Sequence, residues 1–429
     1  MTENKMKANS IEDALNLFDP HHPLFEEDDL KAYYVSRADS PIEEMKTVLR
    51  TATDFPKLLF SGPPGCGKST ELGQLKEALK KEFHVILFSI REVSNLREVS
   101  LDGMMYYILS KIADKAKDEK LPIYQEKIER YLRRGLGWET AIESSATRKG
   151  LKELEADFKA LSAVKDGGEI DYVEKYVFKS VSKPGLDSIL DMINATVWDL
   201  EEKTKKDVLV LVTDMDKVNP DNVLDLFTKS ILYLTKLNCF AVYTFPIELK
   251  YRNDFIDLYR QFTGIYFLPN FMLYDRHGVP NSNSQKQLRE IIERRISPKL
   301  IYDDAVDMIV ELSGGVVFEL IHLVRQCCIV SLMEKIKFID DEVVKIAEER
   351  VRKMYRMVYG HDDRKLLFEI HRDKKFIKSD GFWKLFRQFS FSEYGLGEDV
   401  WYDVNPILRP FIQNFVIEPS NISQGGHSD

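Results

Sequence analysis

A glycine-rich run at residues 62–69, GPPGCGKS, constrains this chain more than any other feature. It fits the pattern GxxxxGK[ST], and it stands between a short apolar run and a stretch with helical spacing. Glycines allow backbone angles that other residues resist, so successive N–H groups can curve around the oxygens of a phosphate. The following helix would direct the free N–H groups of its first turn at the same phosphates. The pattern therefore predicts a phosphate-binding loop, made of Gly62, Pro63, Pro64, Gly65, Cys66, Gly67, Lys68, Ser69 and Thr70.

Two side chains of this loop carry the predicted chemistry. Lys68 is expected to reach the β- and γ-phosphates of a nucleoside triphosphate, and Ser69 to give its hydroxyl oxygen to Mg²⁺. Cys66 stands at a free position of the pattern, so we interpret it as a neutral residue rather than as a redox switch.

Five short, continuously apolar runs predict the strands of one sheet. They are 57–61, 84–90, 207–213, 239–244 and 264–269. Runs without polar alternation are typical of a parallel sheet that is covered on both faces. Helical patterns alternate with these runs, which predicts an α/β fold with a five-stranded parallel sheet.

The rest of the chain reads as helical. A long charged stretch at about 97–200 predicts a helical insertion in a core that spans 1–275. A lid is expected over 285–358, with helices at 286–296, 303–312, 316–335 and 340–358 that are interrupted by Ser313-Gly314-Gly315. A last unit at 361–416 mixes short helical and extended pieces, and the tail at 417–429 is expected to be disordered.

An acidic residue, Asp214, follows the third predicted strand within VLVTDMDK, whereas the second strand ends in SIREV without an aspartate. This order is typical of the additional-strand class of P-loop proteins, in which a nearby carboxylate activates water. The motif can be aligned with the sequence in two ways, and both registers stay open. In the first, Asp214 holds Mg²⁺ and Met215 stands at the place of a catalytic acid. In the second, Thr213 stands at the place of the metal ligand and Asp214 is the base. Asp216 would share this site if the strand continued, and otherwise suggests a cap or an ion pair with Lys217. Both registers lack the usual acidic pair, which predicts slow hydrolysis.

In this order, the motifs resemble those of the AAA+ and STAND branch of P-loop ATPases, most closely its prokaryotic Orc1/Cdc6-like members. The resemblance covers roughly 30–416. It implies that ATP is the nucleotide, with Mg²⁺ as cofactor, and that the chain is an ATP hydrolase. It also implies a helical lid and a C-terminal winged-helix-like domain, which would contain WYDVNPILRPF.

The resemblance also implies roles for individual residues. Tyr34, Val35 and Arg37 would lie on the adenine side, Thr244 would be sensor 1, and Arg260 would be the arginine finger. Simpler interpretations exist for three of them: core packing for Tyr34, β-propensity for Thr244 and a surface position for Arg260. The expected catalytic set is Lys68, Asp214, Asp216, Thr244 and Arg260, and the expected metal ligands are Ser69 and Asp214.

The lid segment SGGVVFEL departs from the family pattern. Phe318 stands where an arginine usually contacts phosphate, and Arg325 lies two helical turns further on. An apolar ring cannot pair with phosphate, so we expect weakened lid closure, for which an arginine supplied by a neighbouring copy would compensate.

The charge balance bears on partners. The 429 residues carry 61 Lys and Arg against 70 Asp and Glu, a net charge of −9, and residues 357–429 hold nine basic against eleven acidic side chains. DNA affinity depends largely on neutralised phosphates, so we expect a homo-oligomer or a protein partner rather than DNA. One basic cluster, Arg372, Lys374, Lys375 and Lys378, leaves DNA possible.

The cysteines and the N-terminus indicate the compartment. The four cysteines form no CxxC pair, which favours a reducing environment. The N-terminal run MTENKMKANSIEDALNLF lacks the apolar core of a signal peptide, and no apolar run reaches the ~20 residues of a membrane helix. The sequence therefore predicts a cytoplasmic protein without a membrane segment.

These features favour an ATP-dependent switch that couples nucleotide state to self-assembly or partner engagement, in a setting such as prokaryotic defence or signalling. Two alternatives stay open. One is an ATP-dependent DNA-binding initiator or transposition-type regulator, and the other is a nucleotide-binding module with little hydrolysis.

Overall fold

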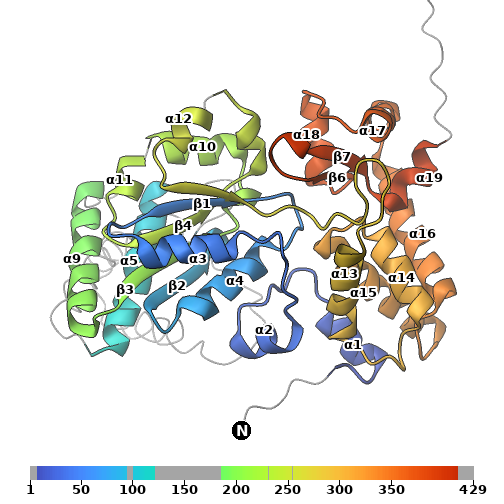
Figure 1. Cartoon of the computed structure of the whole chain (residues 1–429), viewed down its shortest axis with the longest axis horizontal. Coiled ribbons are helices and arrows are strands. Elements are labelled where there is room, and N and C mark those ends of the chain that lie inside the picture. The colour runs from blue at the N-terminus through green and yellow to red at the C-terminus, as the bar shows by residue number, and fades with distance from the viewer. Residues whose placement is uncertain (1–6, 94–99, 121–184, 230, 254, 414–429) are drawn as a thin grey trace, which may run out of the picture. The chain divides into compact units, whose positions relative to one another are not determined.

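The computed structural model describes residues 7–93, 100–120, 185–229, 231–253 and 255–413, which form two compact units (Figure 1). The sheet unit comprises Pro41–Ser61 and Ser69–Phe267. The helical unit comprises Met1–Ser40, Gly62–Lys68 and Leu268–Asp429. The expected tail at 417–429 lies outside the described residues. Residues 121–184 of the expected insertion also lie outside them.

The sheet unit is built on one five-stranded parallel sheet. Its strands are β1 (Lys57–Ser61), β2 (Phe83–Ser89), β3 (Asp207–Thr213), β4 (Phe240–Thr244) and β5 (Gly264–Phe267), in the order β2-β3-β4-β1-β5. The five predicted strands are therefore confirmed. In the sheet β4 lies between β1, which precedes the phosphate loop, and β3, which precedes Asp214.

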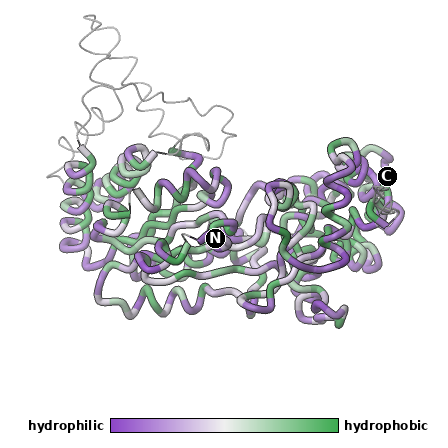
Figure 2. Tube along the Cα trace, turned by 90° about the horizontal axis from the view of Figure 1, so that it is seen from above, coloured by the Kyte–Doolittle hydropathy of each residue, from purple (hydrophilic) through white to green (hydrophobic). Residues whose placement is uncertain are grey.

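The strands are apolar throughout because both faces of the sheet are covered. In β3, Val208, Val210 and Val212 pack into one core cluster, and the alternate residues Leu209 and Leu211 are equally buried on the opposite face. In Figure 1, α3 (Ile42–Thr51) and α4 (Lys68–Leu79) cross the near face of the sheet. Figure 2 shows hydrophobic and hydrophilic stretches alternating along the trace.

The other helices of the sheet unit contribute to the Val208 side of this core. They are α5 (Leu101–Asp118), α9 (Leu186–Thr204), α10 (Pro220–Lys229), α11 (Ile231–Thr235) and α12 (Phe255–Tyr259). Single 3₁₀ turns follow three strands, at Ile90–Glu92, Met215–Lys217 and Ile247–Tyr251. α5 and α9 are the described parts of the stretch at 97–200, and both are helical as predicted.

The helical unit holds the four helices expected over 285–358, which are called the lid helices below after that expectation. They are α13 (Ser282–Glu293), α14 (Asp303–Leu312), α15 (Val317–Glu334) and α16 (Asp341–Val358), and α1 (Ile11–Leu17) shares their core, whereas α2 (Glu27–Tyr33) forms a small cluster of its own. The break before α15 needs glycine: at Gly315, where φ is +84°, a Cβ atom would lie 1.8 Å from the carbonyl oxygen of Phe271. The structure thus explains why Ser313-Gly314-Gly315 separates two helices.

The C-terminal part of this unit consists of short helices and one hairpin. It contains α17 (His361–Asp373), α18 (Asp380–Arg387), the antiparallel strands β6 (Phe391–Tyr394) and β7 (Trp401–Val404), α19 (Arg409–Ile412), and 3₁₀ turns at Gly397–Asp399 and Pro406–Leu408. Aromatic rings of Phe382, Phe386, Phe391 and Tyr402 form its core. This arrangement agrees with the predicted winged-helix-like unit, and the predicted fold class is confirmed. Within the described ranges, no helix combines the length and apolarity needed to span a bilayer.

Candidate functional site

The phosphate loop begins directly after β1, at the carboxyl edge of the sheet. Gly65 and Gly67 have φ values of +75° and +103°, in the region that L-residues with a side chain adopt only with strain. A Cβ atom at Gly67 would meet nothing within 4 Å, so the backbone angle and not space requires glycine there. Left-handed residues that alternate with ordinary ones bend a chain into a concave nest whose N–H groups face an anion. The positive φ values of Gly65 and Gly67 therefore suit such a nest.

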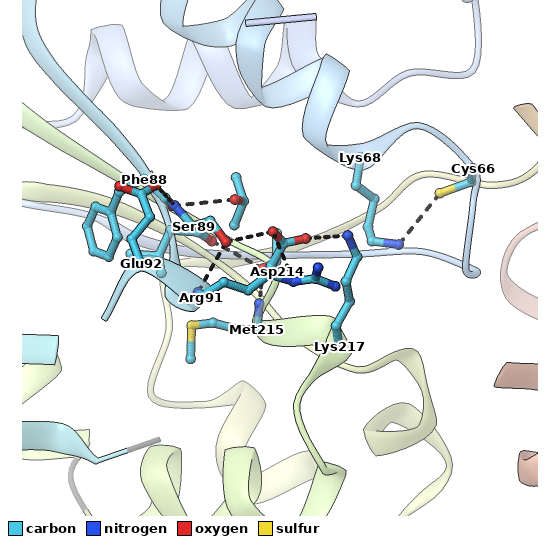
Figure 3. A network of polar contacts seen from close by, with 12 residues as sticks. Cys66, Lys68, Phe88, Ser89, Arg91, Glu92, Asp214, Met215 and Lys217 are labelled. Carbon is cyan, nitrogen blue, oxygen red and sulfur yellow. Dashed lines mark hydrogen bonds and ion pairs between the residues drawn. The ribbon is translucent and has the colours of Figure 1, made fainter. Parts of the chain in front are cut away.

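Lys68 lies folded back over its own loop. Its side chain is buried, and its ammonium donates hydrogen bonds of 3.0 Å to the carbonyl oxygens of Gly62 and Pro63 and lies 3.9 Å from Sγ of Cys66 (Figure 3). The two hydrogen-bond acceptors are neutral carbonyl oxygens of the loop itself. Such an ammonium is a favourable partner for a phosphate oxygen that enters the loop.

Arg37, in the N-terminal segment, makes hydrogen bonds that connect the loop to its surroundings. Its guanidinium donates 3.0 Å to the Cys66 carbonyl and 2.7 Å to the Pro269 carbonyl, pairs with Asp39 at 2.9 Å, and lies 3.9 Å from the ring centre of Phe271. The planar fork of donors lets one buried side chain connect three separate stretches of backbone and carboxylate. Arg37, expected on the adenine side, thus contacts the main chain of the loop itself.

The other two residues expected on the adenine side pack with apolar neighbours. Val35 is buried in the core of the lid helices, and Tyr34 packs, partly buried, beside the cluster of Leu24, Leu30 and Tyr33. These contacts match the simpler interpretation of Tyr34 as a packing residue.

Asp214 is held by three side chains at the ends of β2 and β3. Its carboxylate accepts a 2.6 Å hydrogen bond from the Ser89 hydroxyl, pairs with the Lys217 ammonium at 2.5 Å and lies 3.8 Å from Nε of Arg91 (Figure 3). Burial opposes ionisation of this carboxyl, but Lys217, Ser89 and Arg91 more than offset burial, so the pKa of Asp214 is lower than its ordinary value. The group is a fixed, ionised carboxylate.

The backbone after β3 separates Asp214 from Asp216. The strand ends at Thr213, Asp214 has φ +64°, and a 3₁₀ turn follows at Met215–Lys217. The strand therefore does not continue to Asp216, and the condition under which Asp216 would share the site of Asp214 through the alternation of an extended chain is not met. Lys217 pairs with Asp214, a contact that neither register had included.

The two threonines at this edge bond to backbone. The Thr244 hydroxyl donates 3.1 Å to the Val212 carbonyl and accepts 3.1 Å from the Met215 N–H, so it ties the turn that carries Asp214 to β4. The Thr213 hydroxyl points toward the Phe88 carbonyl of β2, 3.4 Å away. Among these residues the structure brings Ser89, Arg91 and Lys217 to Asp214, and sequence reasoning missed the first two because no spacing relates residues that are 125 and 123 positions away along the chain.

Arg260 and the lid residues lie in different surroundings. Arg260 is exposed directly after α12, close along the chain to the exposed apolar side chains of Ile256 and Tyr259.

In the helical unit, the N–H of Phe318 donates a 3.1 Å hydrogen bond to the Gly65 carbonyl of the phosphate loop. Arg325 donates instead to the Leu15 carbonyl at 2.7 Å, which turns its guanidinium toward α1.

The basic cluster expected as a DNA contact is partly neutralised. Arg372 pairs with Asp373 at 2.7 Å, and Lys374 pairs at 2.5 Å with the buried carboxylate of Asp403, which also binds His371 and Arg409. Two of the four cations therefore already have carboxylate partners, which reduces the charge available to a nucleic-acid backbone.

The parallel sheet with a strand between β1 and β3, and the glycine loop with its lysine after β1, define the fold of this chain as an α/β fold of the P-loop class. No protein-family model matches the chain, and no curated protein matches its sequence.

Solved structures of other proteins are similar to this chain at low sequence identity. Cdc6p from Pyrobaculum aerophilum shares 10% identity over 91% of this chain and 94% of its own, with a TM-score of 0.42. The Aeropyrum pernix Orc1 protein, solved in complex with DNA, shares 11% over 94% and 97%, with a TM-score of 0.41. The Thermotoga maritima RuvB Holliday junction branch migration motor shares 12% over 89% and 96%, with a TM-score of 0.40.

Proposed function

We propose that this chain binds ATP with Mg²⁺ at the phosphate loop, hydrolyses it slowly, and couples its nucleotide state to self-assembly or partner engagement. The observation that carries the proposal is the buried Lys68 ammonium over a loop with positive φ at Gly65 and Gly67. A triphosphate oxygen is a charged acceptor, and a hydrogen bond from an ammonium to a charged oxygen is stronger than one to a neutral carbonyl.

The donor set at the carboxyl edge of the sheet fits Mg²⁺. Ser69 opens α4 beside Lys68, and Asp214 is an ionised carboxylate, so both supply the oxygen ligands that this cation prefers. Bound Mg²⁺ would neutralise developing charge on the phosphates. The Thr213 hydroxyl is directed at a backbone carbonyl, which favours the register in which Asp214 rather than Thr213 serves the metal.

Slow turnover follows from what stands near these ligands. Met215, at the place of a catalytic acid, is fully buried and has no proton-accepting group. Asp214 is paired with Lys217, which competes with a cation for the same oxygen. These two observations also favour the alternative in which the chain binds ATP and hydrolyses little.

Arg260 is our candidate for completing the site of a second copy. It is exposed, and Ile256 and Tyr259 of the preceding helix are 60% and 54% exposed, so apolar side chains are accessible to a partner close to this charge along the chain. An arginine delivered this way contributes roughly 10³–10⁵ in rate in P-loop enzymes. Turnover per chain should therefore rise with protein concentration, and Arg260→Ala should remove that rise while leaving ATP affinity unchanged.

The central test compares the full chain with Lys68→Ala and with Lys81→Ala, an exposed lysine just after α4 that serves as the control. Calorimetric titration with ATP and Mg²⁺ should show binding to the unaltered chain and to Lys81→Ala but not to Lys68→Ala. Phosphate release should follow the same pattern. Binding without phosphate release would support the non-hydrolysing alternative. Absence of binding to the full chain, or equal binding to Lys68→Ala, would overturn the proposal.

Assembly is tested separately by sizing the protein with and without a non-hydrolysable ATP analogue. A larger species with the analogue, absent in Lys68→Ala, is the expected result. An unchanged size in both would remove self-assembly from the proposal and leave partner engagement.

A further inference from the structure

Gly65 of the phosphate loop is enclosed by apolar side chains of the helical unit. A Cβ atom at Gly65 would lie 2.7 Å from the ring of Phe389, 2.8 Å from Cβ of Phe318 and 2.9 Å from Val316. These distances are too short for any real Cβ, so glycine is required here by close approach as well as by φ. The loop and these three residues form one packed contact.

The two aromatic rings at this contact support each other. Phe318 and Phe389 are stacked, with ring centres 4.7 Å apart and planes inclined by 16°. His21 adds an edge-on contact to Phe318 at 5.5 Å. Phe318 belongs to α15 of the lid, whereas Phe389 belongs to the turn between α18 and β6. The C-terminal part of the chain therefore reaches the phosphate loop through the ring of Phe389.

The side of the loop that is contacted can be derived from its hydrogen bonds. The Gly65 carbonyl accepts a 3.1 Å bond from the N–H of Phe318. In a nest the N–H groups line the concave side that receives the anion, and the carbonyls point away from it. The backbone of Phe318 thus approaches the loop at the Gly65 carbonyl, and the ring of Phe389 stacks on that of Phe318 beside it.

The backbone of Phe389 is held in an unfavourable conformation. Its φ is +59°, a region that bulky residues seldom occupy, and its carbonyl accepts a 3.1 Å bond from the Asn405 side chain. On either side of it, the Ser390 hydroxyl pairs with the Tyr359 hydroxyl at 2.5 Å, and the Gln388 carbonyl accepts from Tyr355 at 3.5 Å. Tyr355 belongs to α16 and Tyr359 is the residue that caps the C-terminus of this helix, so contacts from α16 and its end hold the turn that carries Phe389.

We propose that Phe389 is a positioning residue of the phosphate loop: its ring, stacked on Phe318, presses on Gly65 and holds the loop in the shape that receives phosphate. The inference rests on the proposed function and deepens it, because it makes nucleotide affinity depend on how the C-terminal part is seated. A ligand that moves the turn at Phe389 changes the loop, and phosphate in the loop favours the seated turn.

The test uses two substitutions that remove the same ring with opposite effects on the backbone. Phe389→Gly relieves the positive φ, whereas Phe389→Ala keeps its strain, so the alanine variant should melt at a lower temperature than the glycine variant. Phe411→Ala is the control, because Phe411 lies in α19, where its ring packs under the guanidinium groups of Arg356 and Arg364.

The first measurement is amide exchange of the loop in full-length protein without nucleotide. Both Phe389 variants should exchange the amides of residues 65–68 several-fold faster than wild type, and Phe411→Ala should not. The second measurement is ATP binding and turnover. Both variants should raise the KM for ATP about 10-fold with little change in kcat, because the loop is less well ordered before binding.

The outcomes separate this inference from the function that it rests on. Wild-type exchange in Phe389→Gly, or effects that follow melting temperature rather than loss of the ring, would overturn the positioning role. If wild type binds no ATP, the proposed function fails, but loop exchange still decides whether Phe389 positions the loop.

Discussion

The Ser89 hydroxyl donates a 2.6 Å hydrogen bond to Oδ2 of Asp214, and so joins the last residue of β2 to the residue that follows β3. The two strands pair in parallel with Ser89 opposite Thr213, which brings this hydroxyl to the carboxylate. Since the bond fixes the orientation of a proposed metal ligand, it makes Ser89 a supporting residue for Mg²⁺.

We therefore expect Ser89→Ala to weaken the apparent affinity for Mg²⁺ about 10-fold, the lower end of the range for removal of such supporting bonds. Loss of the donor should also raise the pKa of Asp214, because Ser89 is one of the groups that keep it low. A titration of ATP binding against Mg²⁺ concentration measures the effect. Ser89→Thr, which keeps a hydroxyl, is the control, and equal curves for Ala and wild type would contradict the role.

Lys217→Met should have the opposite effect on the same titration. The ammonium neutralises Asp214 at 2.5 Å and occupies the oxygen that a cation would use, so its removal should tighten the apparent Mg²⁺ affinity. Lys236→Met, at an exposed lysine of the sheet unit, controls for loss of one positive charge. A lower apparent Mg²⁺ affinity in Lys217→Met than in that control would contradict the prediction and show that Lys217 supports the metal site.

Thr244→Val should destabilise the sheet unit by about 1–3 kcal/mol, the usual penalty for leaving buried polar groups unpaired. The valine cannot bond to the Val212 carbonyl or the Met215 N–H, both of which are held by the hydroxyl. Urea unfolding measures the change. Thr244→Ser retains the hydroxyl and should lose less, and equal losses in both variants would assign the effect to the methyl group.

Gly67→Ala should cost about 1 kcal/mol or more in stability through its backbone alone, because a Cβ there meets no neighbour. Gly278 is a matched control: its φ is +86°, and a Cβ there also meets nothing within 4 Å. Both alanine variants should shift thermal unfolding by similar amounts, but only Gly67→Ala should lose ATP binding. Retained binding in Gly67→Ala would contradict the proposed cradle.

The buried Glu319 predicts a pH dependence of stability. Burial raises its pKa from 4.5 to about 7, a rise that a hydrogen bond to Asn405 partly opposes. Because the folded state binds this proton more tightly than the unfolded state, the stabilisation is complete below pH 4.5 and is lost as pH rises through about 7. The difference amounts to about 3 kcal/mol. Glu319→Gln should flatten the unfolding free energy between these pH values, and an unchanged slope would contradict the assignment.

The sequence alone determined the strands and the loop between β1 and α4. Strand prediction succeeded because both faces of this sheet are covered, so β3 reads as an uninterrupted apolar run that no amphipathic helix would show. The loop could be predicted because its glycines meet a requirement of the local backbone, which is the positive φ of Gly65 and Gly67.

Only the tertiary structure decided what surrounds the reactive groups. Strand pairing brought Ser89 and Arg91 to Asp214, and chain packing brought Phe389 to Gly65, over sequence separations that carry no periodic signal. The turn after β3 also replaced the extended chain that would have placed Asp216 beside Asp214. A local pattern records the conformation of its own backbone, whereas a contact between distant residues depends on how every intervening element folds.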